Sequence, residues 1–130
     1  MLDADVLIGA LDQSDQHHER ARRLVTSWHQ QGDALVVSVI NLSEALVAPA
    51  ADQRRLRVAR EAIAALGVTT HSPTEAVGVD AARFRGRHPI SLPDAYLIAT
   101  AKQSAGTVVS FDRKVLRAAA AEGISVAGQE

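Results

Sequence analysis

The sequence predicts an α/β domain with a mainly parallel central sheet and helices on both faces. Apolar runs rich in β-branched residues, such as Leu35–Val39, alternate along the chain with longer segments whose apolar residues recur at helical spacing. Such alternation of strands and helices is typical of a parallel sheet. The 130 residues fit one domain spanning positions 1–130, with an aliphatic core, because Ala, Val and Leu dominate the apolar residues.

The first elements lie close to the start of the chain. Because so few residues precede Asp3, the first strand is either clipped or continues upstream of Met1. Val6–Leu11 predicts a short helix. Asp15 is placed to cap a second helix over Gln16–Gln31, in which apolar residues recur at helical spacing.

The middle of the chain continues the alternation. Leu35–Val39 predicts a strand buried on both faces, followed at once by a helix that ends before Pro49. Arg54–Leu66 predicts the next helix, with Gly67 in a position suited to end it. Val68–His71 then predicts a short strand.

Two segments in the second half of the chain have the composition of helix starts. Ser72–Glu75 offers a serine cap, a proline in the first turn and an acid three residues after the cap, ahead of a helix towards Arg85. Ser91–Asp94 repeats this order ahead of a helix over Ala95–Ala105, which Gly106 closes.

The C-terminal part predicts a strand, a helix and a final strand. These are Thr107–Phe111, Arg113–Glu122 and Ile124–Ala127, with Asp112 directly at the carboxyl end of the first. In open parallel sheets, ligand chemistry gathers at the carboxyl ends of the strands. Asp112 is therefore a candidate site residue.

Composition excludes several classes of protein. The absence of cysteine excludes a disulfide scaffold, a thiolate zinc site and a cysteine nucleophile. With 14 basic and 15 acidic residues, the chain does not coat nucleic acid by charge alone. No apolar run approaches the ~20 residues of a membrane span, and no signal-like segment opens the chain, so we expect a cytoplasmic protein without a membrane partner.

Four acidic residues differ from the others by lying at element ends or among apolar residues: Asp3, Glu44, Asp94 and Asp112. Desolvation of a carboxylate without a partner costs roughly several kcal/mol unless a cation or strong hydrogen bonds offset this cost. Taken singly, Asp94 is explained by the helix dipole and Asp112 by a turn. Taken together, their positions indicate a site for a hard divalent cation such as Mg²⁺ or Mn²⁺.

Four segments carry a resemblance to a known family. Leu2–Ile8, Val39–Ala45, Ile90–Ala101 and Val109–Arg113 occur in this order. Together they resemble the PIN-domain ribonucleases, in particular the VapC toxins of bacterial toxin–antitoxin pairs, over essentially the whole chain. The resemblance implies a three-layer PIN-like fold, a metal-dependent endoribonuclease, an RNA substrate, an antitoxin partner and a homodimer.

The resemblance also implies roles for individual residues. The four acids named above would bind Mg²⁺ or Mn²⁺ and cleave RNA. Ser110 matches a hydroxyl residue that helps to orient a metal-bound water, and Asn41 matches a frequent neighbour of the active site. Asp5 departs from the pattern, in which Asn or Ser is more usual. It is either a further ligand outside the four or the cap of the first helix, and we favour the cap.

Two other interpretations stay open from the sequence. Asp3-Ala4-Asp5-Val6 also fits the nucleophile signature of haloacid-dehalogenase-like phosphatases, in which Asp3 is phosphorylated and Asp5 acts as acid or base. That class leaves Glu44 unexplained. The third interpretation is a non-catalytic interaction module with a PIN-like fold. RNA cleavage without turnover of a phosphate monoester distinguishes the nuclease from the phosphatase.

Overall fold

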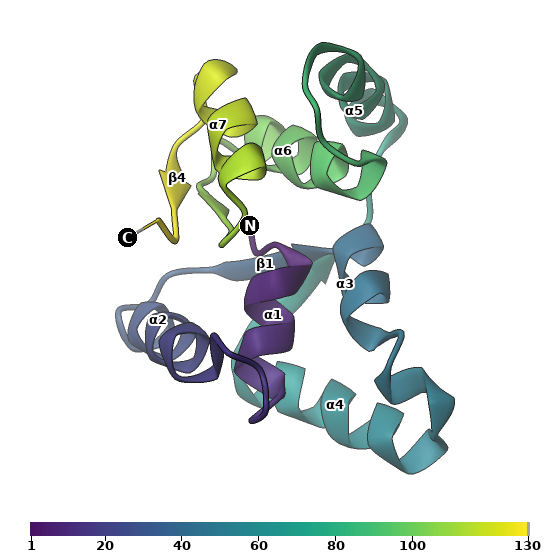
Figure 1. The fold of residues 1–130 in the computed structure, drawn as a ribbon, viewed down its shortest axis with the longest axis vertical. Helices are drawn as coiled ribbons and strands as arrows, with labels where there is room; N and C mark the ends of the chain where they lie inside the picture. Colours follow the sequence, from purple (N-terminus) through teal and green to yellow (C-terminus); the bar gives the residue numbers. More distant parts are fainter. Residues whose placement is uncertain (130) are drawn as a thin grey trace.

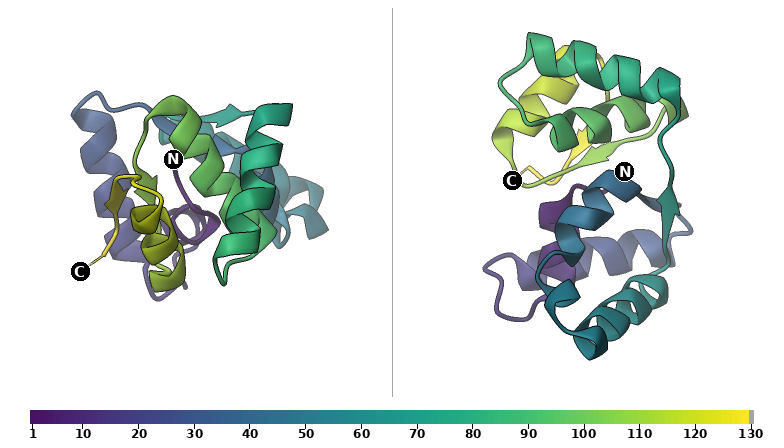
Figure 2. Two further views of the ribbon diagram at one scale, coloured as in Figure 1. Left: turned by 90° about the horizontal axis from the view of Figure 1, so that it is seen from above. Right: turned by 90° about the vertical axis from the view of Figure 1, so that its right-hand side faces the viewer.

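Parallel strands form the centre of the molecule. In the computed structural model, which describes residues 1–129, β1 (Leu35–Ser38) pairs in parallel with β2 (Val68–His71), and β3 (Val108–Val109) pairs in parallel with β4 (Val126–Ala127). Figures 1 and 2 show helices on opposite sides of these strands. The predicted α/β class with parallel strands and helices on both faces is confirmed.

The first residues of the chain connect the two strand pairs. Leu2 forms a parallel bridge with Val109, while its N–H donates to the carbonyl of Val36 in β1 at 2.8 Å. The N–H of Asp3 donates to the Val109 carbonyl at 2.8 Å. These bonds place the start of the chain between β1 and β3. Asp3 follows the bridged residue Leu2 and therefore lies at the edge where β1 and β3 end.

Seven α-helices and one 3₁₀ helix surround the strands in residues 1–129. In Figure 1, α5, α6 and α7 lie above the strands, and α1, α2 and α4 lie below them. None of these helices combines the length and apolar character needed to cross a membrane. The helices are α1 (Ala4–Leu11), α2 (His18–Gln30), α3 (Val39–Leu46), η1 (Pro49–Ala51), α4 (Gln53–Ala65), α5 (Glu75–Arg87), α6 (Leu92–Ser104) and α7 (Arg113–Ala121).

Two clusters of buried apolar side chains pack on the two sides of the strands. The upper cluster includes Phe84 of α5, Leu97 and Ile98 of α6 and Val115 of α7. The lower cluster combines α1, α2, α3 and α4 with β1, β2 and Leu2. Most of these side chains are aliphatic, as the composition predicts.

The predicted starts of α2 and α5 were wrong. Asp15 does not cap α2; its carboxylate accepts from the N–H of His17 at 2.8 Å within a turn, and the helix begins at His18 without a side-chain cap. Thr74, not Ser72, caps α5 by accepting from the Val77 N–H. Local hydrogen bonds from backbone N–H groups to polar side chains thus determine where these helices begin.

Some predicted strands are longer than the observed ones. β1 ends at Ser38 rather than Val39, because the Ser38 hydroxyl accepts from the Ile40 N–H and starts α3. β4 begins at Val126 because the N–H of Ile124 binds the last turn of α7 instead. The end of β3 is set by the site described below.

The C-terminal ends of α5 and α7 are joined by an ion pair. Nε and Nη2 of Arg87 donate to the carboxylate of Glu122 at 3.1 and 2.8 Å, and the ring of His88 contacts the same carboxylate. Hydrogen bonds from Arg87 first, and from His88 second, lower the pKa of Glu122 to about 2. The Glu122 side chain is mostly buried, whereas that of Arg87 is half exposed.

We expect Glu122→Gln to lower the free energy of unfolding by about 1 kcal/mol at pH 7, since screening at Arg87 keeps the effect small. A carboxylate whose pKa is lowered on folding contributes stability above its unfolded pKa of about 4.3, and this contribution is lost as pH falls towards about 2. The difference between the proteins therefore shrinks over that range. Urea denaturation at pH 7, 4 and 3 measures it, with the exposed acid variant Glu61→Gln as control. A difference that does not change with pH contradicts the prediction.

Candidate active site

Asp3 lies at the centre of the candidate site with both carboxylate oxygens held. Its side chain is only 5% exposed. Oδ1 accepts from the N–H of Ala4 at 2.7 Å, so Asp3 caps α1, and Oδ2 accepts from the hydroxyl of Ser110 at 2.7 Å. These bonds fix one carboxylate between the start of α1 and the end of β3.

Ser110 joins Asp3 to Asp112. The buried Ser110 hydroxyl donates to Asp3 and accepts from the N–H of Asp112 at 3.0 Å. Asp112 is exposed and caps α7 by accepting from the Lys114 N–H at 2.9 Å. Because its hydroxyl proton is directed at Asp3, Ser110 positions two of the predicted acids relative to each other.

Asn41 joins the elements that carry the other two acids. Its buried amide nitrogen donates to Oε1 of Glu44 at 3.2 Å and to the carbonyl of Pro93, also at 3.2 Å. Asp94 follows Pro93 and forms the predicted capping box with Ser91, whose N–H donates to Oδ2 of Asp94 at 3.2 Å. α3 and the start of α6 are thus tied together next to Glu44 and Asp94.

Asp5 does not cap α1, contrary to the interpretation that we favoured. Asp3 occupies that position, and Oδ2 of Asp5 accepts instead from the N–H of Phe111 at 3.0 Å. This bond takes up the Phe111 N–H, so β3 ends before Phe111, although the N–H of Ser110 still donates to the carbonyl of Ala127 in β4 at 3.2 Å. Oδ1 of Asp5 is buried with no hydrogen-bond partner among residues 1–129.

The pKa values show that the acids act on one another. Burial first, and then the charge of Asp5, raise the pKa of Asp3 to about 7, while the Ser110 hydroxyl opposes the rise and Asp94 adds to it. Partial desolvation raises the pKa of Glu44, with the Asn41 hydrogen bond opposing and Asp94 adding. Asp3, Asp5, Glu44 and Asp94 therefore belong to one region of concentrated negative charge.

The donor set fits a hard divalent cation by its chemistry. It consists of carboxylate oxygens. Burial and repulsion from neighbouring carboxylates favour the protonated forms of Asp3 and Glu44, and a cation relieves both effects. In the part of the chain that the structure describes, no three acidic or histidine side chains come close enough to enclose an ion on their own. Mg²⁺ usually retains several waters and binds one or two protein carboxylates, so a loosely spaced set suits it.

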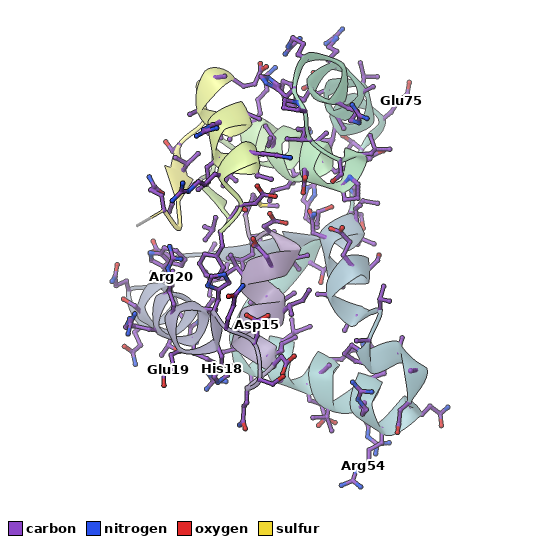
Figure 3. The ribbon with its side chains drawn as sticks, viewed as in Figure 1. Asp15, His18, Glu19, Arg20, Arg54 and Glu75 are labelled. Carbon is purple, nitrogen blue, oxygen red and sulfur yellow. The ribbon has the colours of Figure 1, made fainter. Side chains whose placement is uncertain are left out.

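A groove adjoins one of the four candidate acids, Glu44. It has a volume of about 760 Å³ and runs from Glu44 between α1, α3 and α4. Its walls are mostly apolar, with Arg54 and Arg55 of α4 and the acids Asp12 and Asp52 along its length. Figure 3 shows Arg54 at the far end of α4 from the strands.

The comparisons with known proteins decide the family. The PIN domain family model matches residues 1–121. The chain belongs to the PIN domain family. No match was found among curated protein sequences.

Solved structures share the fold of this PIN domain. FitAcB from Neisseria gonorrhoeae is 24% identical, with 96% of this chain and 94% of that chain covered and a TM-score of 0.67. VapC20 from Mycobacterium tuberculosis, a sarcin-ricin loop cleaving toxin, is 19% identical, with coverage of 90% and 92% and a TM-score of 0.73. VapBC2 from Rickettsia felis, bound to a DNA fragment from its promoter, is 12% identical, with coverage of 98% and 96% and a TM-score of 0.71. The predicted resemblance to the PIN family is confirmed, and VapC toxins are among the structural neighbours.

The PIN fold brings the seven predicted site residues to one edge, in two linked groups. Ser110 links Asp3 with Asp112, and Asn41 links Glu44 with the segment that precedes Asp94. Sequence reasoning did not assign Phe111, although its N–H binds Asp5. Its position in the sequence, between Ser110 and Asp112, was the signal that could have identified it as a site residue.

Proposed function

We propose that this PIN domain is a metal-dependent endoribonuclease that hydrolyses RNA phosphodiesters, and that Asp3, Glu44, Asp94 and Asp112 hold Mg²⁺ or Mn²⁺. The observation that supports the proposal most strongly is the environment of Asp3. A buried carboxylate with a pKa of about 7, surrounded by further carboxylates, is typical of a functional site. PIN domains are generally nucleases that use divalent ions, and the VapC20 toxin cleaves an RNA loop.

The residues of the chain divide the work. Ser110 and the N–H of Ala4 hold Asp3 in one orientation, and Asn41 holds Glu44. A bound divalent ion lowers the pKa of a water molecule and neutralises charge that develops on the phosphate. Ser110 donates a hydrogen bond to Asp3. It therefore positions that carboxylate and acts on water only through it.

Single-stranded or looped RNA is the substrate that we propose. In such RNA the backbone and bases are accessible, whereas the bases of a duplex are not. The exposed arginines of α4 lie along the groove that adjoins Glu44, where they offset repulsion between the carboxylates and RNA phosphates. Cellular RNA is found in the cytoplasm, where we propose that the enzyme acts.

A cognate antitoxin and a second copy of the chain are the proposed protein partners. FitAcB and VapBC2 are complexes of toxin–antitoxin components, which supports an antitoxin as partner. The apolar groove beside Glu44 offers a surface on which such a partner would cover the acids. We propose that residues 1–130 form a single domain, that this domain is the toxin of the pair, and that two copies of it form a homodimer.

The proposal is tested with purified protein free of partners. The protein is incubated with total cellular RNA in Mg²⁺ or Mn²⁺, with and without EDTA, and fragment ends are mapped. Discrete cleavage that EDTA abolishes supports a metal-dependent ribonuclease and identifies the target. Folded protein that leaves RNA intact in both metals overturns the proposal, and turnover of a phosphate monoester in its place favours the phosphatase interpretation of Asp3 and Asp5.

A further inference from the structure

A cationic and aromatic cluster lies beside the carboxylates. It consists of Phe111, which follows β3, together with Arg20 of α2 and His17 just before α2; we call these residues the Phe111 cluster. Cζ of Arg20 lies 4.4 Å from the centroid of the Phe111 ring. The ring of His17 lies 4.8 Å from it, centroid to centroid, at an interplanar angle of 42°. All three side chains are half-buried, so each keeps part of its surface open to solvent.

The position of the cluster is fixed relative to the acids. Phe111 lies between Ser110 and Asp112 in the chain, and its N–H donates to Asp5. His17 is close enough to Asp5 for its charge to act on that carboxylate. Figure 3 shows that Arg20 projects from α2 towards the part of the molecule that contains α7 and β4. The cluster therefore directly adjoins Asp5 and Asp112 of the candidate site.

Core packing accounts for only one side of Phe111. The ring packs against the lower apolar cluster, and an aliphatic side chain would fill that place equally well. A guanidinium over the ring and an imidazole beside it are not needed for that packing. Aromatic rings and arginine planes are the surfaces on which proteins stack the bases of single-stranded RNA.

We propose that the Phe111 cluster is a nucleobase subsite, which stacks on one base of single-stranded RNA next to the phosphate that is cleaved. The inference rests on the proposed ribonuclease function and assigns substrate recognition to side chains other than the carboxylates. The ligand is the base rather than the phosphate, because the cluster presents flat surfaces and not charge alone.

The binding test separates the base from the phosphate and needs no cleavage. Fluorescein-labelled single-stranded oligoadenylate is compared with an abasic oligomer of the same length, in EDTA, by fluorescence anisotropy. We expect the natural protein to bind the adenylate about 5- to 100-fold more tightly than the abasic oligomer. Phe111→Leu is expected to remove this ratio and Phe111→Trp to restore it. Arg20→Leu is expected to reduce it, whereas Arg23→Leu, an exposed arginine on the same helix, leaves it unchanged.

A second measurement uses cleavage. In an RNA that contains a mapped cleavage site, single abasic nucleotides are placed on either side of the scissile phosphate. We expect one of these changes to slow cleavage by the natural protein, and to have no additional effect on Phe111→Leu. A purely structural role of Phe111 predicts that the two losses add at every position, and that result overturns the subsite.

The outcomes distinguish the subsite from the ribonuclease itself. Base-dependent binding that is lost in Phe111→Leu, without any cleavage by the natural protein, supports the subsite and overturns the proposed reaction. Cleavage and binding that do not depend on the base overturn the subsite and leave the reaction in place. Absence of RNA binding by the folded protein overturns both.

Discussion

Asp94→Asn is expected to reduce RNA cleavage by on the order of 10²–10³-fold while the fold is retained. The change removes a negative charge from the proposed metal site. It keeps an oxygen that can accept the Ser91 N–H, so the capping box at the start of α6 survives in large part. Cleavage rates at saturating Mn²⁺, together with the urea midpoint of unfolding, measure both effects.

Asp33→Asn is the matched control for this variant. Asp33 is an exposed acid that lies outside the groove lined by Arg54 and Arg55. The same chemical change there is expected to leave cleavage within about twofold of the natural protein, since surface changes have small effects. Equal losses in the two variants, or none at Asp94, contradict the role assigned to Asp94.

The elements that were predicted well are those whose signals are local. β2 spans Val68–His71 as the sequence indicates, because a Gly before it and a polar turn after it fix its ends. The capping box Ser91–Asp94 was also readable, since both hydrogen bonds lie within three residues. Short-range hydrogen bonds of this kind are determined by residue type and spacing alone.

Some features that were missed or predicted wrongly depend on distant partners. The role of Asp5 is set by the N–H of Phe111, 106 positions away, and nothing near Asp5 in the sequence indicates that bond. The link from Asn41 to Pro93 spans 52 positions. The end of α6 also differs from the prediction. Ala105 ends the helix in the left-handed conformation, although glycine at position 106 was the expected terminator.

The candidate site combines both kinds of information. Three of the acids were found from their places at strand ends or helix starts, and Glu44 from its place among apolar residues of a helix. The family resemblance grouped the four. Their electrostatic coupling, such as the effect of Asp94 on Asp3, follows only from the fold, because these residues lie far apart in the chain. The sequence therefore predicts the candidate residues, and the structure adds how Ser110 orients Asp3 and how Asn41 orients Glu44.

Asp3→Asn is expected to make the metal-free protein more stable than the natural protein at pH 8 and to reduce its stabilisation by Mn²⁺. Folding raises the pKa of Asp3 from 3.8 to about 7, with burial as the main cause. Between these values the folded protein holds a proton that the unfolded chain has released, so the free energy of unfolding falls as pH rises. The loss amounts to at most about 4 kcal/mol, and asparagine avoids it because it carries no charge.

The amide also preserves most contacts of Asp3. Its oxygen can accept from the Ala4 N–H, while its nitrogen faces the Ser110 hydroxyl. The altered bond to Ser110 reduces the gain by about 1 kcal/mol. At pH 5 the natural side chain is mostly protonated, so the two metal-free proteins are expected to differ far less there.

Mn²⁺ opposes this difference in stability, because the ion binds the ionised carboxylate and competes with the proton. At 100 times its dissociation constant, Mn²⁺ is expected to stabilise the natural protein by about 2.7 kcal/mol at pH 8, and Asp3→Asn by much less. Urea denaturation at pH 5 and 8, with and without Mn²⁺, measures the free energy of unfolding of each protein. The exposed acid variant Asp33→Asn is the control. Equal stabilisation of all three proteins by Mn²⁺ would remove Asp3 from the metal site. A metal-free Asp3→Asn protein that is less stable at pH 8 would show instead that the charge of Asp3 supports the fold.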